Sequence, residues 1–128
     1  MAGEQGVFYW NELMTRDPEK AKRFYAETLG WSFEAWGEDD GAYFIAMMGE
    51  KPVAGIFNMN NPEFEGIPEH WFSYICVDDV DKTSEMVTAA GGSLMRPVFD
   101  VPDVGRIAIV QDSNGAVVGM MTSSMDDG

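Results

Sequence analysis

The chain of 128 residues has little of what disulfides and metal sites require, with one cysteine, Cys76, and one histidine, His70. A single cysteine excludes an intrachain disulfide and a metal site of the CxxC type. We expect Cys76 to be a small buried side chain, because nothing nearby in the sequence would stabilise a thiolate. Any imidazole chemistry has to use His70. A reducing, cytoplasmic location is the expectation that follows.

Basic residues are also scarce. The chain has 8 lysines and arginines against 22 acidic residues, and its formal net charge is −14. A surface of this charge repels phosphate backbones and anionic lipid headgroups. We therefore expect neither nucleic acid nor a membrane surface as a partner.

Long apolar runs are missing as well. No stretch approaches the length of a membrane span, and the first residues, MAGEQGVFYW, lack a basic segment followed by an apolar one. We expect no transmembrane segment and no targeting segment.

Apolar and aromatic side chains are plentiful. Hydrophobic residues make up 45% of the chain, including four Trp, eight Phe and ten Met. A chain of this length and composition can form a single domain with a sizeable core and an apolar pocket. We expect one domain over residues 1–128.

The segment TRDPEKAKRFYAETLGW, residues 15–31, occurs twice in approximate form. Shifting the chain on itself by about 62 positions aligns similar residues, as an internal repeat does. The aligned pairs are Asp17 with Asp79, Lys20 with Lys82, Phe24 with Met86, Tyr25 with Val87, and Gly30 with Gly92. Two similar halves within one domain follow from this repeat.

Each half predicts a strand, a helix and three further strands. In the first, Asp17 is suited to cap a helix that ends at Gly30, with Ala21, Phe24, Tyr25 and Thr28 on its apolar side. The predicted strands are 7–14, 31–36, 42–48 and 53–59, with turns at 37–41 and 49–52.

The second half repeats this plan after a proline-containing connector, residues 60–69. Its predicted elements are strand 70–77, helix 80–90, and strands 93–99, 105–111 and 116–122, with a hairpin turn at 112–115 and an acidic tail at 123–128. The fold class is therefore α+β, built from two βαβββ modules over about residues 7–59 and 70–122.

A duplicated βαβββ unit resembles the vicinal oxygen chelate superfamily, the fold of glyoxalase I, bleomycin-resistance proteins and extradiol dioxygenases. The segments WNELMTRDPEKAKRFYAETLGW, WFSYICVDDVDKTSEMVTAAGG and VGRIAIVQDSNGAVVG carry the resemblance. It implies an eight-stranded mixed sheet curled into a cup, with the helices outside and a site inside. Small relatives of this kind are commonly dimeric, so the resemblance also implies a homodimer.

Metal enzymes of the glyoxalase type place one His or Glu ligand on each of four strands. Their pattern, laid on this chain, puts Trp10, Gly55, Phe72 and Gly119 at the ligand positions. None of these side chains can bind a divalent metal. Neighbouring Glu12 and His70 supply fewer than the three protein ligands of a catalytic zinc site. The resemblance therefore predicts a branch with no metal and no cofactor.

Strand alternation predicts an aromatic and methionine-rich lining for the cup. Such a lining is typical of a pocket for a small apolar or aromatic molecule, although the same side chains could simply fill a core. The expected ligand-binding residues are Phe8, Trp10, Met14, Phe57, Met59, Phe72 and Met121.

Three polar residues on the expected cup face are candidates for catalysis: Glu12, Tyr74 and His70. Burial would raise the pKa of Glu12 and prepare it as a proton acceptor, or it could be a structural carboxylate with a basic or amide partner. Tyr74 could orient a ligand through its hydroxyl. His70 follows a proline-rich loop, where a half-exposed rim position without a chemical role is the simpler interpretation.

The leading hypothesis is a metal-independent protein that binds a small apolar or aromatic molecule in its cup. One alternative is a lyase, isomerase or hydroxylase-like enzyme with Glu12 as general base. Another is a scaffold or dimerisation module without small-molecule chemistry.

Overall fold

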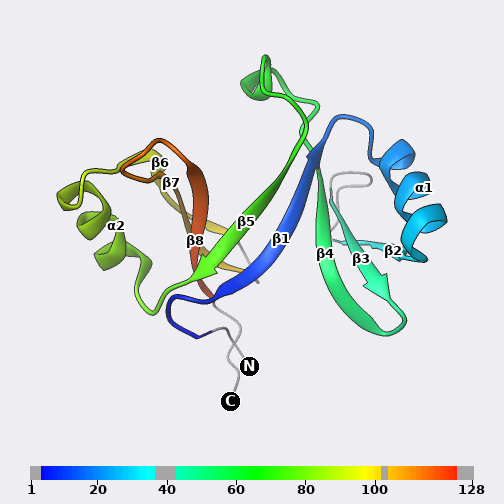
Figure 1. Cartoon of the computed structure of the whole chain (residues 1–128), viewed down its shortest axis with the longest axis horizontal. Coiled ribbons are helices and arrows are strands. Elements are labelled where there is room, and N and C mark those ends of the chain that lie inside the picture. Colours follow the sequence, from blue (N-terminus) through cyan, green and yellow to red (C-terminus); the bar gives the residue numbers. More distant parts are fainter. Residues whose placement is uncertain (1–3, 37–42, 102–103, 124–128) are drawn as a thin grey trace. The chain divides into compact units, whose positions relative to one another are not determined.

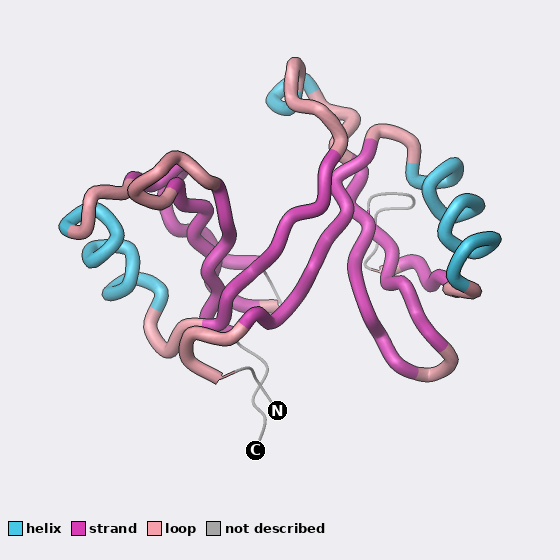
Figure 2. The backbone as a smooth tube through the Cα atoms, in the orientation of Figure 1, coloured by secondary structure: helices cyan, strands magenta, loops and turns pink. Residues whose placement is uncertain are grey.

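The computed structural model describes residues 4–36, 43–101 and 104–123. Figure 1 and Figure 2 show the path of the chain and its secondary structure. The elements are β1 (Phe8–Thr15), α1 (Pro18–Leu29), β2 (Ser32–Ala35), β3 (Tyr43–Met48), β4 (Lys51–Asn58), the 3-10 helix η1 (Pro62–Phe64), β5 (His70–Cys76), α2 (Val80–Ala89), β6 (Ser93–Val101), β7 (Gly105–Gln111) and β8 (Val117–Ser123).

The βαβββ order occurs twice, which confirms the predicted α+β class. The strands form an eight-stranded mixed sheet in the order β2-β3-β4-β1-β5-β8-β7-β6. The chain divides into two compact units: Trp10–Phe72, here called the first unit, and Met1–Tyr9 with Ser73–Gly128, the second unit. The predicted cup involves both units, and it stays a prediction.

Both helices begin as the sequence indicates. The side chain of Asp17 accepts a hydrogen bond from the Lys20 amide at 3.1 Å, and Asp79 does the same for Lys82 at 3.2 Å. These bonds satisfy backbone donors that have no partner inside the helix. Gly30 ends α1 in the left-handed conformation, with φ of 80°, which glycine adopts at little cost.

In the first unit, α1 covers one face of the sheet (Figure 1). Leu13, Phe44 and Ile56 form the buried core on that face, and Ala21 and Tyr25 of α1 pack against it. The registers are parallel between β1 and β4 and antiparallel between β3 and β4. Since side chains alternate along a strand, the neighbours of these core residues lie on the opposite face.

The second unit has its own core of Val77, Val80, Ala108 and Val110. β5 pairs in parallel with β8, and β7 pairs antiparallel with both β6 and β8. Outside the core, Arg106 of β7 forms an ion pair with Asp81 of α2 at 2.8 Å. The two units therefore repeat one packing plan.

The structure corrects several predicted details. Phe24, expected on the apolar side of α1, is 58% exposed, because Ala21 and Tyr25 occupy the packing face. β4 begins at Lys51, within the predicted turn, because this hairpin needs only Gly49 and Glu50. Ser123 belongs to β8 and not to the tail. The turn predicted at 37–41 and most of the tail lie outside the described residues.

The predicted connector, 60–69, contains η1, where the side chain of Asn61 accepts a hydrogen bond from the Glu63 amide at 3.0 Å. Across the described ranges, neither helix has the length and hydropathy that crossing a membrane would require.

Candidate functional site

The sheet face opposite α1 in the first unit carries the most chemically distinctive side chains. The register places Glu12 beside Gly55 and Met14 beside Phe57 between β1 and β4, and Phe57 beside Tyr43 between β4 and β3. Strand alternation adds Trp10 and Ile45 to the same side. We call this surface the Glu12 face; it consists of Trp10, Glu12, Met14, Tyr43, Ile45, Gly55 and Phe57.

A hydrogen-bond network connects three of these side chains. The indole Nε1 of Trp10 donates to the Tyr43 hydroxyl at 2.9 Å. The Tyr43 hydroxyl is in turn hydrogen-bonded to Glu12, which is only 9% exposed. Because an ionised carboxylate only accepts hydrogen bonds, the Tyr43 hydroxyl is the donor to Glu12.

The environment of Tyr43 keeps its proton in place. Burial raises the pKa of the Tyr43 hydroxyl well above its ordinary value of 10.0, and the negative charge of Glu12 raises it further. The hydrogen bond from Trp10 opposes this shift without cancelling it. Tyr43 is therefore a neutral donor at any physiological pH.

Gly55 leaves the space that Tyr43 fills. A Cβ atom built at Gly55 would overlap the hydroxyl and ring of Tyr43, and would lie 3.0 Å from Nε1 of Trp10. Its φ is not in the left-handed region, so space and not backbone conformation requires glycine here. No metal-binding side chain fits at position 55 while Tyr43 keeps this position.

The structure brings together four predicted site residues on the Glu12 face: Trp10, Glu12, Met14 and Phe57. Two further predicted residues of this unit are buried: Met59 is fully buried, and Phe72 is 9% exposed. Their burial matches the alternative in which such side chains fill a core. The functional roles of all six stay predictions.

His70, at the start of β5, is half-buried and lies close to a backbone carbonyl. Its Nδ1 is 2.7 Å from the carbonyl oxygen of Pro68, and its ring is 6.3 Å from that of Phe72. Since a carbonyl can only accept, this contact places the proton on Nδ1 and leaves Nε2 as the acceptor in the neutral ring.

Other predicted residues belong to the second unit. Tyr74 lies beside Gly119 in the β5–β8 register, and Cys76 lies beside Met121. Cys76 and Met121 are each 4% exposed, as expected for Cys76, whereas Phe8 is 63% exposed. That these residues and Glu12 line one cup stays a prediction.

Tyr43 is a site residue that the sequence pattern did not indicate. It is the first residue of β3, and its place depends on the register of β3 against β4. The available signal was the glycine at position 55, since a glycine within a strand indicates the close approach of another group.

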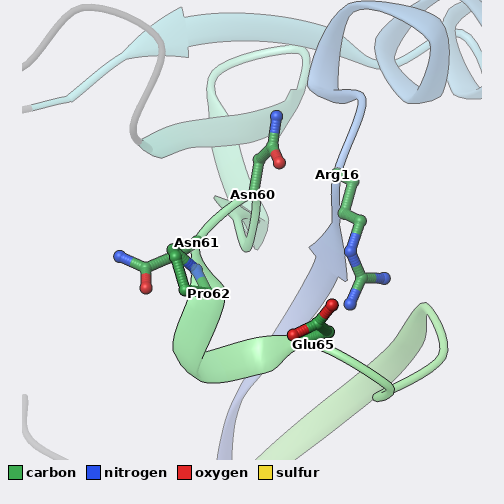
Figure 3. Close-up of a pocket in the computed structure, with 5 residues that line it drawn as sticks. All are labelled: Arg16, Asn60, Asn61, Pro62 and Glu65. Atoms are coloured by element: carbon green, nitrogen blue, oxygen red, sulfur yellow. The ribbon is translucent and has the colours of Figure 1, made fainter.

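A polar pocket of about 370 Å³ lies where β1 and β4 end. Figure 3 shows its lining residues, which are Arg16, Asn60, Asn61, Pro62 and Glu65. Arg16 follows β1, and the other four belong to the connector. The sequence pattern of residues 60–69 predicted only a connector and no site.

The expected absence of a metal stays a prediction. The four positions that the resemblance implies for ligands hold Trp10, Gly55, Phe72 and Gly119, whose side chains offer no suitable donor atom. Within the part of the chain that the structure describes, no group of three or more His, Cys, Asp and Glu side chains could hold a metal ion.

Comparison with known proteins identifies similar sequences. The model of the Glyoxalase/Bleomycin resistance protein/Dioxygenase superfamily matches residues 8–120. CFP32 of Mycobacterium tuberculosis, provisionally named a glyoxylase, is 39% identical over an alignment of 123 positions, which covers 91% of this chain and 45% of CFP32. The anthracycline biosynthesis protein DnrV of Streptomyces peucetius is 25% identical over an alignment of 135 positions, which covers 96% of this chain and 49% of DnrV. The chain spans about half the length of these two relatives.

Among solved structures, methylmalonyl-CoA epimerase of Streptomyces coelicolor in complex with 2-nitronate-propionyl-CoA is similar, with a TM-score of 0.67. The match covers 95% of this chain and 100% of the epimerase at 13% identity, which shows a shared fold.

Proposed function

Because this chain belongs to the glyoxalase/bleomycin resistance protein/dioxygenase superfamily, we propose that it binds a small, largely apolar or aromatic molecule on the Glu12 face, without a divalent metal. The face offers Met14, Ile45 and Phe57 as apolar contacts and one carboxylate, Glu12, as an anchor. A few polar groups within an apolar surface are the usual composition of a small-molecule site.

The observation that carries the proposal is the position of Tyr43. Its hydroxyl occupies the space beside Gly55 where a ligand side chain would project, and it is hydrogen-bonded to Trp10 and Glu12. A network of hydrogen bonds thus occupies one position that the resemblance implies for a metal ligand, which supports the proposal.

Two similar proteins are named with small organic molecules. DnrV is named as an anthracycline biosynthesis protein, and anthracyclines are polycyclic aromatic compounds. The epimerase structure holds an acyl-CoA analogue, which shows that this fold can accept a small organic molecule.

Metal content and ligand binding test the proposal together. We expect purified protein to contain no stoichiometric zinc, nickel, iron or manganese, and to bind 2-naphthol equally well before and after treatment with EDTA. Stoichiometric metal whose removal abolishes binding would contradict the proposal. So would a thermal-shift screen of polycyclic aromatic compounds in which none stabilises the protein.

An enzyme with Glu12 as general base is the second candidate. The observation in its favour is the hydrogen bond from Tyr43, which stabilises the charged, proton-accepting form of a buried carboxylate. Tyr74 and His70 are the polar partners proposed for it.

Replacement of Glu12 by glutamine distinguishes the two functions. If Glu12 is a general base, Glu12→Gln lowers kcat by a factor of roughly 100 or more while the ligand still binds. Unchanged turnover by a well-folded Glu12→Gln protein excludes the catalytic role. Unfolding of this variant indicates a structural carboxylate.

The proposal includes a homodimer and a cytoplasmic location. Exposed aromatic side chains on the first unit, among them Phe24 and Trp71, support self-association. The buried thiol of the single cysteine, Cys76, suits a reducing compartment. If the chain is monomeric and binds none of the screened molecules, neither ligand binding nor catalysis is supported. The scaffold role would then be the remaining hypothesis.

A further inference from the structure

The polar pocket lies at one end of the Glu12 face. Glu12 and Met14 are two residues apart on β1, so strand alternation places both side chains on this face. Arg16 is the residue that follows the end of β1. Pairing with the β4 segment continues to this point, because the Met59 amide donates to the Thr15 carbonyl at 2.8 Å.

Phe64 connects the face to the pocket. Its ring packs against that of Phe57, on the Glu12 face, with 5.7 Å between the centroids. Its carbonyl oxygen accepts a hydrogen bond from Nη2 of Arg16 at 2.6 Å. Phe64 therefore contacts Arg16 through its carbonyl and the Glu12 face through its ring.

Arg16 has donors to spare. The bond to Phe64 uses one of the five N–H groups of a guanidinium, and the described part of the chain contains no carboxylate in an ion pair with Arg16. The nearby carboxylate of Glu69 accepts from the Thr15 hydroxyl at 2.6 Å and from the Arg16 amide at 3.3 Å. An unpaired arginine in a chain of charge −14 is notable, because carboxylates are abundant.

The other polar lining groups are the side-chain amides of Asn60 and Asn61 and one competitor for Arg16, the carboxylate of Glu65. The side-chain oxygen of Asn61 accepts from the Glu63 amide, and in Figure 3 this side chain is directed away from Arg16, so Arg16 is the cation that we assign to the anion. In Figure 3 the carboxylate of Glu65 is turned toward the guanidinium of Arg16, at a distance beyond an ion pair. Glu65 is exposed and follows η1, so it can move aside for another anion.

We propose that this pocket binds the anionic group, a carboxylate or a phosphate, of a ligand whose apolar body lies against Met14 and Phe57. The inference rests on the proposed function, and it narrows the ligand class to amphipathic anions. Arg16 is suited to the task, since a guanidinium pairs with both groups through two parallel hydrogen bonds.

Matched aromatic probes test this inference. Isothermal titration at low salt would compare naphthalene-2-carboxylate and 2-naphthyl phosphate with the neutral naphthalene-2-carboxamide. We expect at least one anion to bind about tenfold more tightly than the amide, the usual gain from a charge-assisted pair. The anion with the larger preference identifies the ligand group.

Two variants assign the preference to this pocket. Arg16→Gln should reduce the anion preference to about one while the affinity for the amide is kept, because it removes the charge. Glu65→Gln should increase the preference several-fold, because it removes the competing carboxylate. This second variant keeps the Arg16 bond to Phe64, so it remains informative even if Arg16→Gln is unstable.

The outcomes separate this inference from the proposed function. Equal affinity of the wild-type protein for anions and amide overturns the inference and leaves the proposed function standing. A preference that survives Arg16→Gln, or that Glu65→Gln does not raise, also overturns it. Failure of all three probes to bind contradicts the proposed function itself.

Discussion

At the scale of single residues, Gly55 and Tyr43 define the chemistry of the Glu12 face. The missing side chain at Gly55 admits the Tyr43 hydroxyl, and that hydroxyl is hydrogen-bonded to both Trp10 and Glu12. The three polar groups satisfy one another in a partly buried setting. Loss of any one would leave a partner without its bond, which costs more than the bond contributes.

Gly55→Ala should destabilise the protein by about 1–3 kcal/mol, because the new methyl group overlaps Tyr43 and forces it to move. Urea unfolding measures the change. The matched background is Tyr43→Leu, in which the same Gly55→Ala substitution should cost clearly less, because the obstructing ring is gone. Equal costs in the two backgrounds would show that Tyr43 does not occupy this space.

Tyr43→Phe should change how stability depends on pH. Tyr43 has a raised pKa in the folded protein, so above its ordinary value of 10.0 the unfolded chain loses this proton before the folded one does. The unfolded state then binds fewer protons, and stability falls as the pH rises. The wild-type protein should lose about 1 kcal/mol more than Tyr43→Phe between pH 9 and pH 11.

Urea titrations of both proteins at the two pH values provide this measurement. Below that range Tyr43→Phe should be the less stable protein, by about 1–3 kcal/mol, because the Trp10 and Glu12 groups lose their partner. Parallel loss of stability in the two proteins on raising the pH would contradict the buried, neutral tyrosine.

At the scale of elements, an aromatic cluster joins α1, the residue before β2 and β5 on the helix-side face of the first unit. Tyr25 stacks on Trp31 at 5.2 Å between ring centroids, and Trp71 donates from its indole to the Tyr25 hydroxyl at 3.2 Å. Phe24 packs edge-on against Tyr25 at 5.0 Å. Phe24 is 58% exposed and Trp71 42% exposed, so the cluster presents apolar surface to solvent.

The internal repeat supplies a matched pair of variants for the proposed homodimer. Phe24 and Met86 are equivalent positions on α1 and α2, and they are 58% and 60% exposed. If the aromatic cluster is the dimer surface, Phe24→Glu should weaken the dimer by about tenfold or more, since a buried, unpaired charge is costly. Met86→Glu should leave it unchanged.

Sedimentation equilibrium of both variants over a range of concentrations measures the dissociation constant. A dimer weakened equally by both substitutions, or by Met86→Glu alone, would place the interface elsewhere. A wild-type chain that is monomeric at every concentration would exclude the homodimer.

At the scale of the whole molecule, much of the fold was predictable because it depends on local signals. Asp17 and Gly30 mark the ends of α1, Asp79 marks the start of α2, and the repeat relates the two helices. Cap and turn preferences depend on a few neighbouring residues, so they can be read without tertiary contacts. Strand alternation likewise placed Trp10, Glu12 and Met14 on one face.

The candidate site was only partly predictable, because its remaining residues meet through pairing between distant segments. The sequence by itself determined the βαβββ repeat, the caps and the acidic charge. Only the tertiary structure decided that Tyr43 fills the space at Gly55, and that Arg16 meets the connector at Phe64. Those contacts depend on strand register and loop path, and a shift of one residue in register would turn each side chain to the other face.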